Sequence, residues 1–273
     1  AHEIDLEKQT LTLINSQDSG GLTPCYVSLD LANRFLLAAN YSSGTFRCYP
    51  IQDNGGLGSS IQTVQHHGQS VHSERQTEPH IHCILTDPSN YFVYAVDLGA
   101  DQIVSYTFNS NTGEINKIHD GVTNLPPGAG PRHLYFHPKY PWVYLITELS
   151  NRIHCYKIAE GSKLIETHQL STIPENKNSE SFSADIAIDP LGLFLYTSNR
   201  GHDCISIFCI SQIDGTLEYL TTVSAEGKYP WSLYINSTGE FLIVTNKLSN
   251  NIVFFQRNNE NGMLDKTAEL LDV

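Results

Sequence analysis

The 273-residue sequence contains no hydrophobic run long enough to cross a bilayer and no signal-peptide pattern at its start, so it predicts no membrane-spanning helix. It also lacks any long stretch with the hydrophobic period of a helix. Its cysteines, at positions 25, 48, 83, 155, 204 and 209, form no CxxC pair of the metal-binding type. We therefore interpret them as free, buried thiols in a reducing compartment and predict a cytoplasmic protein without a disulfide framework.

Basic residues are scarce, since 16 Lys and Arg stand against 29 Asp and Glu and give a formal net charge of −13. This balance argues against nucleic acid and anionic membranes as partners. An acidic protein can still bind an anion where its few cations are concentrated. The positions of the Lys and Arg residues therefore matter more than their total.

The sequence repeats itself five times at intervals of 47 to 57 residues. Each copy opens on a β-rich run, continues with a second apolar run and, after a short polar turn, a third run with an aromatic residue in register. A Gly-x-Leu or Gly-x-Ile turn then opens a weaker fourth run, as at Gly56-Leu57 and Gly113-Ile115. The openings are Pro24-Cys25, Ile81-His82, Pro131-Arg132, Ser183-Ala184 and Pro230-Trp231, and the aromatic residues are Tyr49, Tyr106, Tyr156, Phe208 and Phe255. Four short strands in about fifty residues are typical of a β-propeller blade, so we predict an all-β propeller of four-stranded antiparallel blades.

Because stacked repeats share one continuous core and no linker separates them, the sequence predicts a single propeller domain over residues 1–273. Residues 1–23 have the strand, turn, strand pattern of the end of a blade. Five blades and such a remnant do not close a ring, and an open arc would leave unpaired strand edges. We expect the sequence to be part of a longer protein.

The most polar connection, residues 66–78, has the sequence HHGQSVHSERQTE and is long for a link between blades. It is predicted either as a functional loop or as a solvated crossover. His80 and His82 follow it and, standing two apart in a predicted strand, should face the same side. An HxH pair can chelate a metal, but no third ligand stands at a clear spacing, so no metal site is predicted.

Strand order places two sets of residues around one end of the ring, because the start of a first strand and the end of an antiparallel second strand lie together. The first set is Cys25, His82, Arg132, Ala184 and Trp231, and the second is Tyr41, Leu98, Glu148, Arg200 and Lys247. These sets bring together one imidazole, one carboxylate and three cations. They predict a small pocket for an anionic ligand with a group positioned for proton transfer.

At these residues the sequence resembles the propeller-type lactonase family, which includes 6-phosphogluconolactonase and the 3-carboxy-cis,cis-muconate lactonizing enzyme. The matching strings cover nearly the whole chain; they are TPCYVSLD, FLLAANYSSGT, ERQ followed by PHIH, DLGADQIVSY, GAGPRHLYFHP, TELSNRI, ADIAIDP and SNRGHDCISIF. PHIH, GPRH, ELS and SNRGHD are specific in combination. The resemblance implies seven blades in the complete protein, of which about five to six are represented, with N-terminal blade segments and a short C-terminal closing strand lacking.

The resemblance also implies a catalytic set of His82, Arg132, Glu148 and Arg200, with His80 as the alternative histidine. His80, Arg132, Arg200 and Lys247 are the expected substrate-binding residues. No cofactor or metal is expected, and the implied partner is a small anionic lactone, most specifically 6-phosphogluconolactone of the pentose phosphate pathway. The chain departs from the family at Lys228–Ser232, where it has KYPWS instead of the WPR-type string of many members, so an arginine that the resemblance leads us to expect is absent. A milder departure is Thr147, where asparagine is commoner.

Lactone opening needs a base for the attacking water and a positive neighbour for the oxyanion. Glu148 or His82 can supply the base, and arginine binds carboxylate or phosphate with its planar fork. The same groups could serve a muconate-type cycloisomerase, and a non-catalytic binding propeller is the alternative outside enzymes. In structural terms, Arg132 could brace blades, Glu148 could only pair with an arginine, and His82 could be a core histidine.

Overall fold

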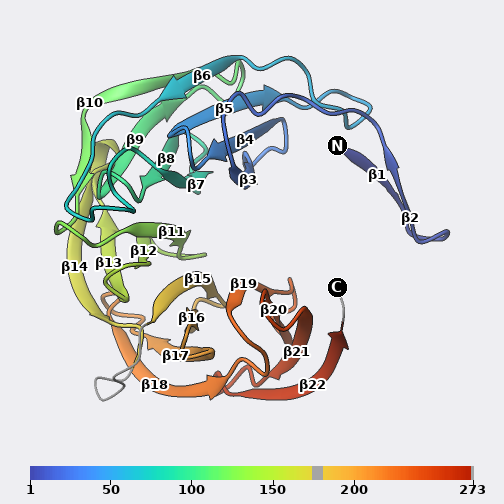
Figure 1. The fold of residues 1–273 in the computed structure, drawn as a ribbon, viewed down its shortest axis with the longest axis vertical. Coiled ribbons are helices and arrows are strands. Elements are labelled where there is room, and N and C mark those ends of the chain that lie inside the picture. Colours follow the sequence, from blue (N-terminus) through green and yellow to red (C-terminus); the bar gives the residue numbers. More distant parts are fainter. Residues whose placement is uncertain (174–180, 272–273) are drawn as a thin grey trace. The chain divides into compact units, whose positions relative to one another are not determined.

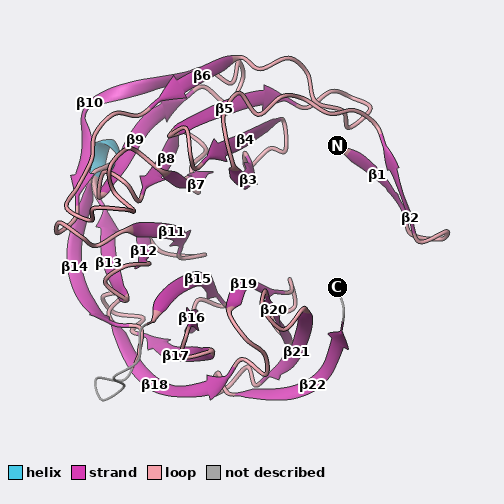
Figure 2. Cartoon of the chain, viewed as in Figure 1, coloured by secondary structure: helices cyan, strands magenta, loops and turns pink. Residues whose placement is uncertain are grey.

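The computed structural model describes residues 1–173 and 181–271. The described chain is built almost entirely of β-strands (Figure 2), and its one helical element is a 3₁₀ turn, η1, at Glu160–Ser162. It divides into two compact units, Ala1–Gly128 and Ala129–Val273. The predicted all-β class is confirmed.

The first unit contains a two-stranded hairpin and two four-stranded antiparallel blades (Figure 1). The hairpin pairs β1 (His2–Asp5) with β2 (Thr10–Leu13), as the strand, turn, strand pattern of residues 1–23 predicts. The first blade consists of β3 (Pro24–Leu29), β4 (Phe35–Asn40), β5 (Thr45–Pro50) and β6 (Gln62–Gln65), and the second of β7 (Ile81–Thr86), β8 (Phe92–Asp97), β9 (Gln102–Phe108) and β10 (Ile115–Asn124).

The second unit contains three blades of the same design, each with its four strands in chain order (Figure 1). They are β11 (Pro131–Phe136), β12 (Trp142–Thr147), β13 (Arg152–Ile158) and β14 (Leu164–Ser171); β15 (Phe182–Ile188), β16 (Phe194–Arg200), β17 (Cys204–Ile210) and β18 (Leu217–Ser224); and β19 (Pro230–Ile235), β20 (Phe241–Asn246), β21 (Asn251–Arg257) and β22 (Leu264–Leu271). The predicted four-stranded blades are confirmed in both units.

The third-strand aromatic residues occupy equivalent places, as predicted. All five are buried, and each pairs with the second residue of the preceding strand, as Tyr156 does with Val143 and Phe208 with Leu195. One fourth strand differs from the prediction. In the first blade Leu57 makes only an isolated bridge to Ile51, and β6 begins five residues later. The glycine-rich run after Pro50 explains the delay, since glycine disfavours extended pairing.

Neighbouring blades of a unit pack a glycine turn against an aromatic ring. Gly215 and Gly262 have φ of 76°, and an added Cβ would lie 2.5 Å from the rings of Trp142 and Phe194, respectively. Only glycine combines this left-handed backbone with so close an approach. Tyr144, from the middle of β12, donates a hydrogen bond of 2.9 Å to the carbonyl of Gly215. These contacts fix the order and spacing of the blades in the second unit.

All six cysteines are free, but they are not all buried as predicted. Cys25 is exposed at the start of β3, where its thiol lies 3.4 Å from the carbonyl oxygen of Ile81 in the neighbouring blade. Burial raises the pKa of the Cys48 and Cys155 thiols to about 12, which keeps them protonated and unreactive.

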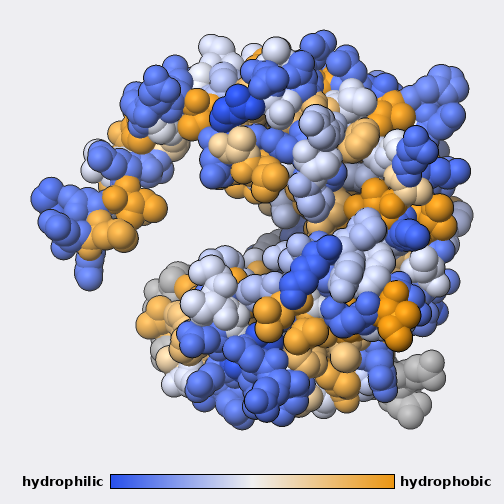
Figure 3. Space-filling view, turned by 180° about the vertical axis from the view of Figure 1, so that it is seen from behind, coloured by the Kyte–Doolittle hydropathy of each residue, from blue (hydrophilic) through white to orange (hydrophobic). Residues whose placement is uncertain are grey.

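Exposed hydrophobic residues lie in small groups among hydrophilic ones in the space-filling view of Figure 3. Within the described ranges, no helix has the length and apolar character needed to span a membrane.

Candidate active site

The first strand of every blade pairs irregularly with the second at the position that the sequence comparison selected. In β3, β7, β11 and β19 the register slips at Cys25, His82, Arg132 and Trp231, respectively. In β15, Ala184 and Asp185 together stand opposite one residue of β16. Such β-bulges re-aim side chains and are common beside active sites. The bulge therefore presents a different side chain at the same place in each blade.

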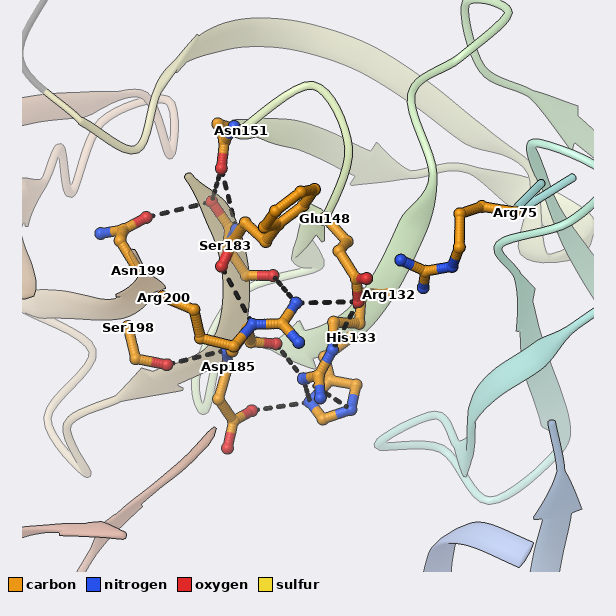
Figure 4. Close-up of polar contacts among 12 residues, drawn as sticks. Arg75, Arg132, His133, Glu148, Asn151, Ser183, Asp185, Ser198, Asn199 and Arg200 are labelled. Atoms are coloured by element: carbon orange, nitrogen blue, oxygen red, sulfur yellow. Dashed lines mark hydrogen bonds and ion pairs between the residues drawn. The ribbon is translucent and has the colours of Figure 1, made fainter. Parts of the chain in front are cut away.

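In the second unit Glu148 joins two arginines from different blades (Figure 4). Its Oε2 accepts a hydrogen bond from Arg132 Nε at 3.1 Å and forms an ion pair with Arg200 Nη2 at 2.9 Å. All three side chains are at least 96% buried. Guanidinium groups at this distance favour the charged form of a carboxylate. Glu148 can therefore serve to orient the two arginines at least as well as it can serve as a proton acceptor.

Backbone carbonyls complete the positioning of both arginines. Arg132 Nη1 donates to the carbonyl of Ala184, and Arg200 donates to those of Phe182 and Ser183, each at 3.1 Å. The predicted bracing of adjacent blades by Arg132 thus occurs together with its pairing to Glu148. One contact does not exclude the other, because a guanidinium carries five N–H donors.

Trp231 is the common neighbour of three cations. Its ring centroid lies 5.4 Å from Arg132 Cζ, 5.0 Å from Arg200 Cζ and 4.4 Å from Lys247 Nζ. These distances are in the range of cation–π attraction. Trp231 and Lys247 also line a pocket of about 500 Å³. At the position where the resemblance led us to expect an arginine, the chain therefore has Trp231, whose aromatic ring contacts three cationic side chains.

His133 and Asp185 form a hydrogen-bonded pair beside this cluster, with 2.7 Å between Nδ1 and Oδ1. Burial lowers the pKa of His133, and Arg132 lowers it further, while Asp185 acts in the opposite direction. Burial alone would raise the pKa of Asp185, but the attraction and hydrogen bond of His133, with the Leu233 N–H and Arg132, hold it at about 2. The sequence comparison missed both residues.

In the first unit His80, His82 and Arg75 surround Tyr41. The His80 and Tyr41 rings stack at 4.3 Å, the His82 ring meets Tyr41 edge-on at 5.4 Å, and Arg75 Nη2 donates to the tyrosine hydroxyl at 3.1 Å. The expectation that both histidines stand in a strand is wrong for His80. β7 begins at Ile81, and the bulge at His82 breaks the alternation on which a shared face depends.

The polar connection 66–78 is largely exposed but is anchored at two buried residues. His66 is buried and bonds Asp97 through Nδ1 at 2.9 Å and the Tyr106 hydroxyl through Nε2 at 2.8 Å. Gln76 is also buried and donates to the carbonyl of Leu98 at 2.8 Å. These bonds hold the loop that leads into His80.

Of the predicted site residues, the second unit brings together Arg132, Glu148 and Arg200, with Lys247 beside them across the Trp231 ring. His80 and His82 lie in the first unit, and their convergence with the others stays a prediction. Among the residues that the structure describes, no three His, Cys, Asp or Glu side chains are grouped as a metal ion would need.

Three comparisons with known proteins point to one family. The chain is 37% identical over 265 residues to the 6-phosphogluconolactonase of Bacillus subtilis, covering 97% of this chain and 74% of the relative. It is 32% identical over 278 residues to the 6-phosphogluconolactonase of Formosa agariphila, covering 100% and 78%. Among solved structures, the periplasmic gluconolactonase of Pseudomonas aeruginosa matches with a TM-score of 0.93 and 26% identity, covering 100% of this chain and 76% of that one. A family model described as "Lactonase, 7-bladed beta-propeller" matches residues 1–273, and the chain therefore belongs to this family of propeller lactonases.

Proposed function

We propose that this protein hydrolyses a phosphorylated sugar lactone, 6-phosphogluconolactone, to 6-phosphogluconate. The observation that carries the proposal is the Arg132–Glu148–Arg200 cluster, with Lys247 held beside it by Trp231. Relatives named 6-phosphogluconolactonase that match at 37% and 32% identity support the choice of substrate.

The cluster suits an anionic lactone because its three cations exceed its one carboxylate. Arginine binds phosphate or carboxylate oxygens through two parallel hydrogen bonds, and a cation also stabilises the oxyanion that forms during attack on a carbonyl. We assign Arg132 and Arg200 to binding the substrate's anionic oxygens and to stabilising the oxyanion. We assign Lys247, which is exposed, to the phosphate group. Trp231 offers an aromatic surface to the sugar ring next to them.

The reaction adds the oxygen of a water molecule to the lactone carbonyl carbon and breaks the bond to the ring oxygen, which leaves as a hydroxyl after taking up a proton. A base must accept the proton of the attacking water. His82 and Glu148 are the two groups proposed for this step. The ion pairs of Glu148 favour His82 as the base and Glu148 as the group that orients the arginines. His80 is proposed to bind substrate.

We also propose that residues 1–273 belong to one propeller domain and that the protein acts in the cytoplasm. Blades of one design in both units support the first point. Six free cysteines support the second. The relative from Pseudomonas aeruginosa is named as periplasmic, so the compartment needs its own test by cell fractionation.

The deciding experiment measures hydrolysis of freshly generated 6-phosphogluconolactone and of gluconolactone by the complete protein, above the spontaneous rate. We expect a higher kcat/KM for the phosphorylated lactone, because Lys247 has no phosphate group to bind in gluconolactone. Catalysis of gluconolactone alone would refute the phosphate assignment. No acceleration with either lactone would refute the proposed hydrolysis, and 3-carboxy-cis,cis-muconate would then test the cycloisomerase alternative.

A further inference from the structure

The contacts of Arg132 beyond Glu148 involve the residue that follows it in the chain. Its Nη1 lies 3.4 Å from Nδ1 and 3.3 Å from Nε2 of His133. Successive residues of a regular strand point to opposite faces, so such neighbours ordinarily do not touch. The bulge at Arg132 removes this alternation and brings the guanidinium against the imidazole, as Figure 4 shows.

His133 is itself fixed by a carboxylate with several other partners. Asp185 Oδ1 forms a hydrogen bond of 2.7 Å with His133 Nδ1. Its Oδ2 accepts hydrogen bonds from Ser232 Oγ at 2.9 Å and from the Leu233 N–H at 2.8 Å. The Asp185 N–H donates to Ser198 Oγ at 3.0 Å. Strand β19 therefore holds the carboxylate of Asp185, and β16 holds its backbone, so that Asp185 in turn fixes the imidazole.

This arrangement selects one form of the imidazole. An ionised carboxylate only accepts hydrogen bonds, so His133 donates through Nδ1 and leaves Nε2 without a proton. A neutral ring tolerates the nearby guanidinium, whereas an imidazolium would repel it. The charged groups that act on the ring are Arg132, Asp185 and Glu148, and the groups that β16 and β19 contribute to Asp185 are uncharged.

We infer that His133, held as the Nδ1–H tautomer by Asp185, is a positioning residue that fixes the Arg132 guanidinium for lactone hydrolysis. The inference rests on the proposed function for its catalytic consequence. The placement of Arg132 by His133 does not depend on which lactone is the substrate. Glu148 fixes Arg132 at Nε and the Ala184 carbonyl fixes it at Nη1, and the His133 ring, in contact with the same Nη1, restricts the movement of the guanidinium further.

The principal test replaces His133→Asn, because the asparagine amide can still donate to Asp185 and so protects the fold. We expect kcat on 6-phosphogluconolactone to fall about 10-fold to 100-fold, as for a small misplacement of a reacting group. The matched control is His119→Asn, which removes a surface histidine paired with Asp120 and should leave kcat unchanged. Wild-type kcat in folded His133→Asn would overturn the inference.

A second measurement is independent of activity. Side-chain ¹⁵N NMR should report the Nδ1–H tautomer for His133, and the Arg132 Nε–Hε signal should shift with pH at the midpoint of the His133 titration. In Asp185→Asn this midpoint should move to lower pH, because the carboxylate that raises the pKa of His133 is gone. An Arg132 signal that ignores His133 would overturn the inference, even if no lactone is hydrolysed. Coupled signals without lactone hydrolysis would instead refute only the proposed function.

Discussion

Replacing Glu148 by glutamine keeps the size of the side chain but removes the charge that Arg132 and Arg200 share. Because both guanidinium groups are buried, they would lose their common counter-ion without gaining water. Both arginines contact the same oxygen, Oε2, so a glutamine oxygen at that position can still face both of them. The perturbation therefore acts mainly on charge.

The expected magnitudes follow from burial. Breaking a buried ion pair by removing one partner destabilises a protein by about 3–5 kcal/mol. For a chain of this size we expect a fall in Tm on the order of 10 °C. Hydrolysis should fall by about 10²–10⁴ in kcat, because the variant loses either a general base or the anchor of both arginines. Affinity for the anionic product should be kept or increased, since the positive charge of the site grows by one.

The assay combines lactone hydrolysis, product binding by calorimetry and thermal unfolding on the same preparation. Glu226→Gln is the control, because Glu226 pairs with Lys266 at 3.7 Å on the exposed surface of the same unit and such pairs contribute about 0–1 kcal/mol. Unimpaired hydrolysis by Glu148→Gln with every lactone tried would remove Glu148 from the mechanism. The proton transfer would then fall to His82.

Trp231→Ala should raise KM for the phosphorylated lactone about tenfold, since three cation–π contacts are lost, while Trp231→Phe should keep most of the affinity; an unchanged KM in the alanine variant would refute a role in binding. Acid should destabilise the fold, because both Asp185 and His133 have lowered pKa values and the unfolded chain therefore binds more protons as the pH falls. Asp185 contributes about 2 kcal/mol to the free energy of unfolding; this contribution is complete above the ordinary pKa of an aspartate and should disappear toward pH 2. The unfolding free energy of Asp185→Asn should therefore depend less on pH in that window, and an equal dependence would contradict this. Tyr144→Phe should lower the unfolding free energy by about 1 kcal/mol through loss of a buried hydrogen bond, whereas Tyr219→Phe, which alters an exposed one, should have almost no effect in the same denaturation series.

Most of the fold could be predicted from the sequence because each blade repeats the same local pattern. Proline marks the start of three first strands, at Pro24, Pro131 and Pro230, and the third-strand aromatic residues recur in one register. The exception in the first blade shows the limit of such patterns. A Gly-Leu turn predicts where a strand can begin, but Leu57 finds only Ile51 as a partner and the ladder starts later.

The candidate site was predicted in part, and the missing part has one physical cause. The antiparallel order of the first two strands assigned Arg132 and Glu148 to one end of a blade, which agrees with their ion pair. Strand alternation would direct His133 away from its neighbour Arg132, and the alignment of the repeats selected Ala184 rather than Asp185. A bulge adds one residue to one strand of a hydrogen-bonded pair, and the residue types of Arg132 and Ala184 do not predict it. Sequence patterns locate the strand, whereas the side-chain directions at a bulge require coordinates.

At the bulges, the fold determines where a side chain lies, and the residue type determines its chemistry. Every blade places its bulge residue at the same point of the first strand, yet the side chains there are a thiol, an imidazole, a guanidinium, a methyl group and an indole. Because the backbone fixes the position, a substitution at one bulge changes the chemistry of the site without changing the blade. Trp231 is such a case, since it contributes no charge of its own but gathers the cations of Arg132, Arg200 and Lys247 around one ring. Selectivity among lactones can therefore vary within this fold through a substitution such as one at Trp231, which leaves the ion pairs of Glu148 in place.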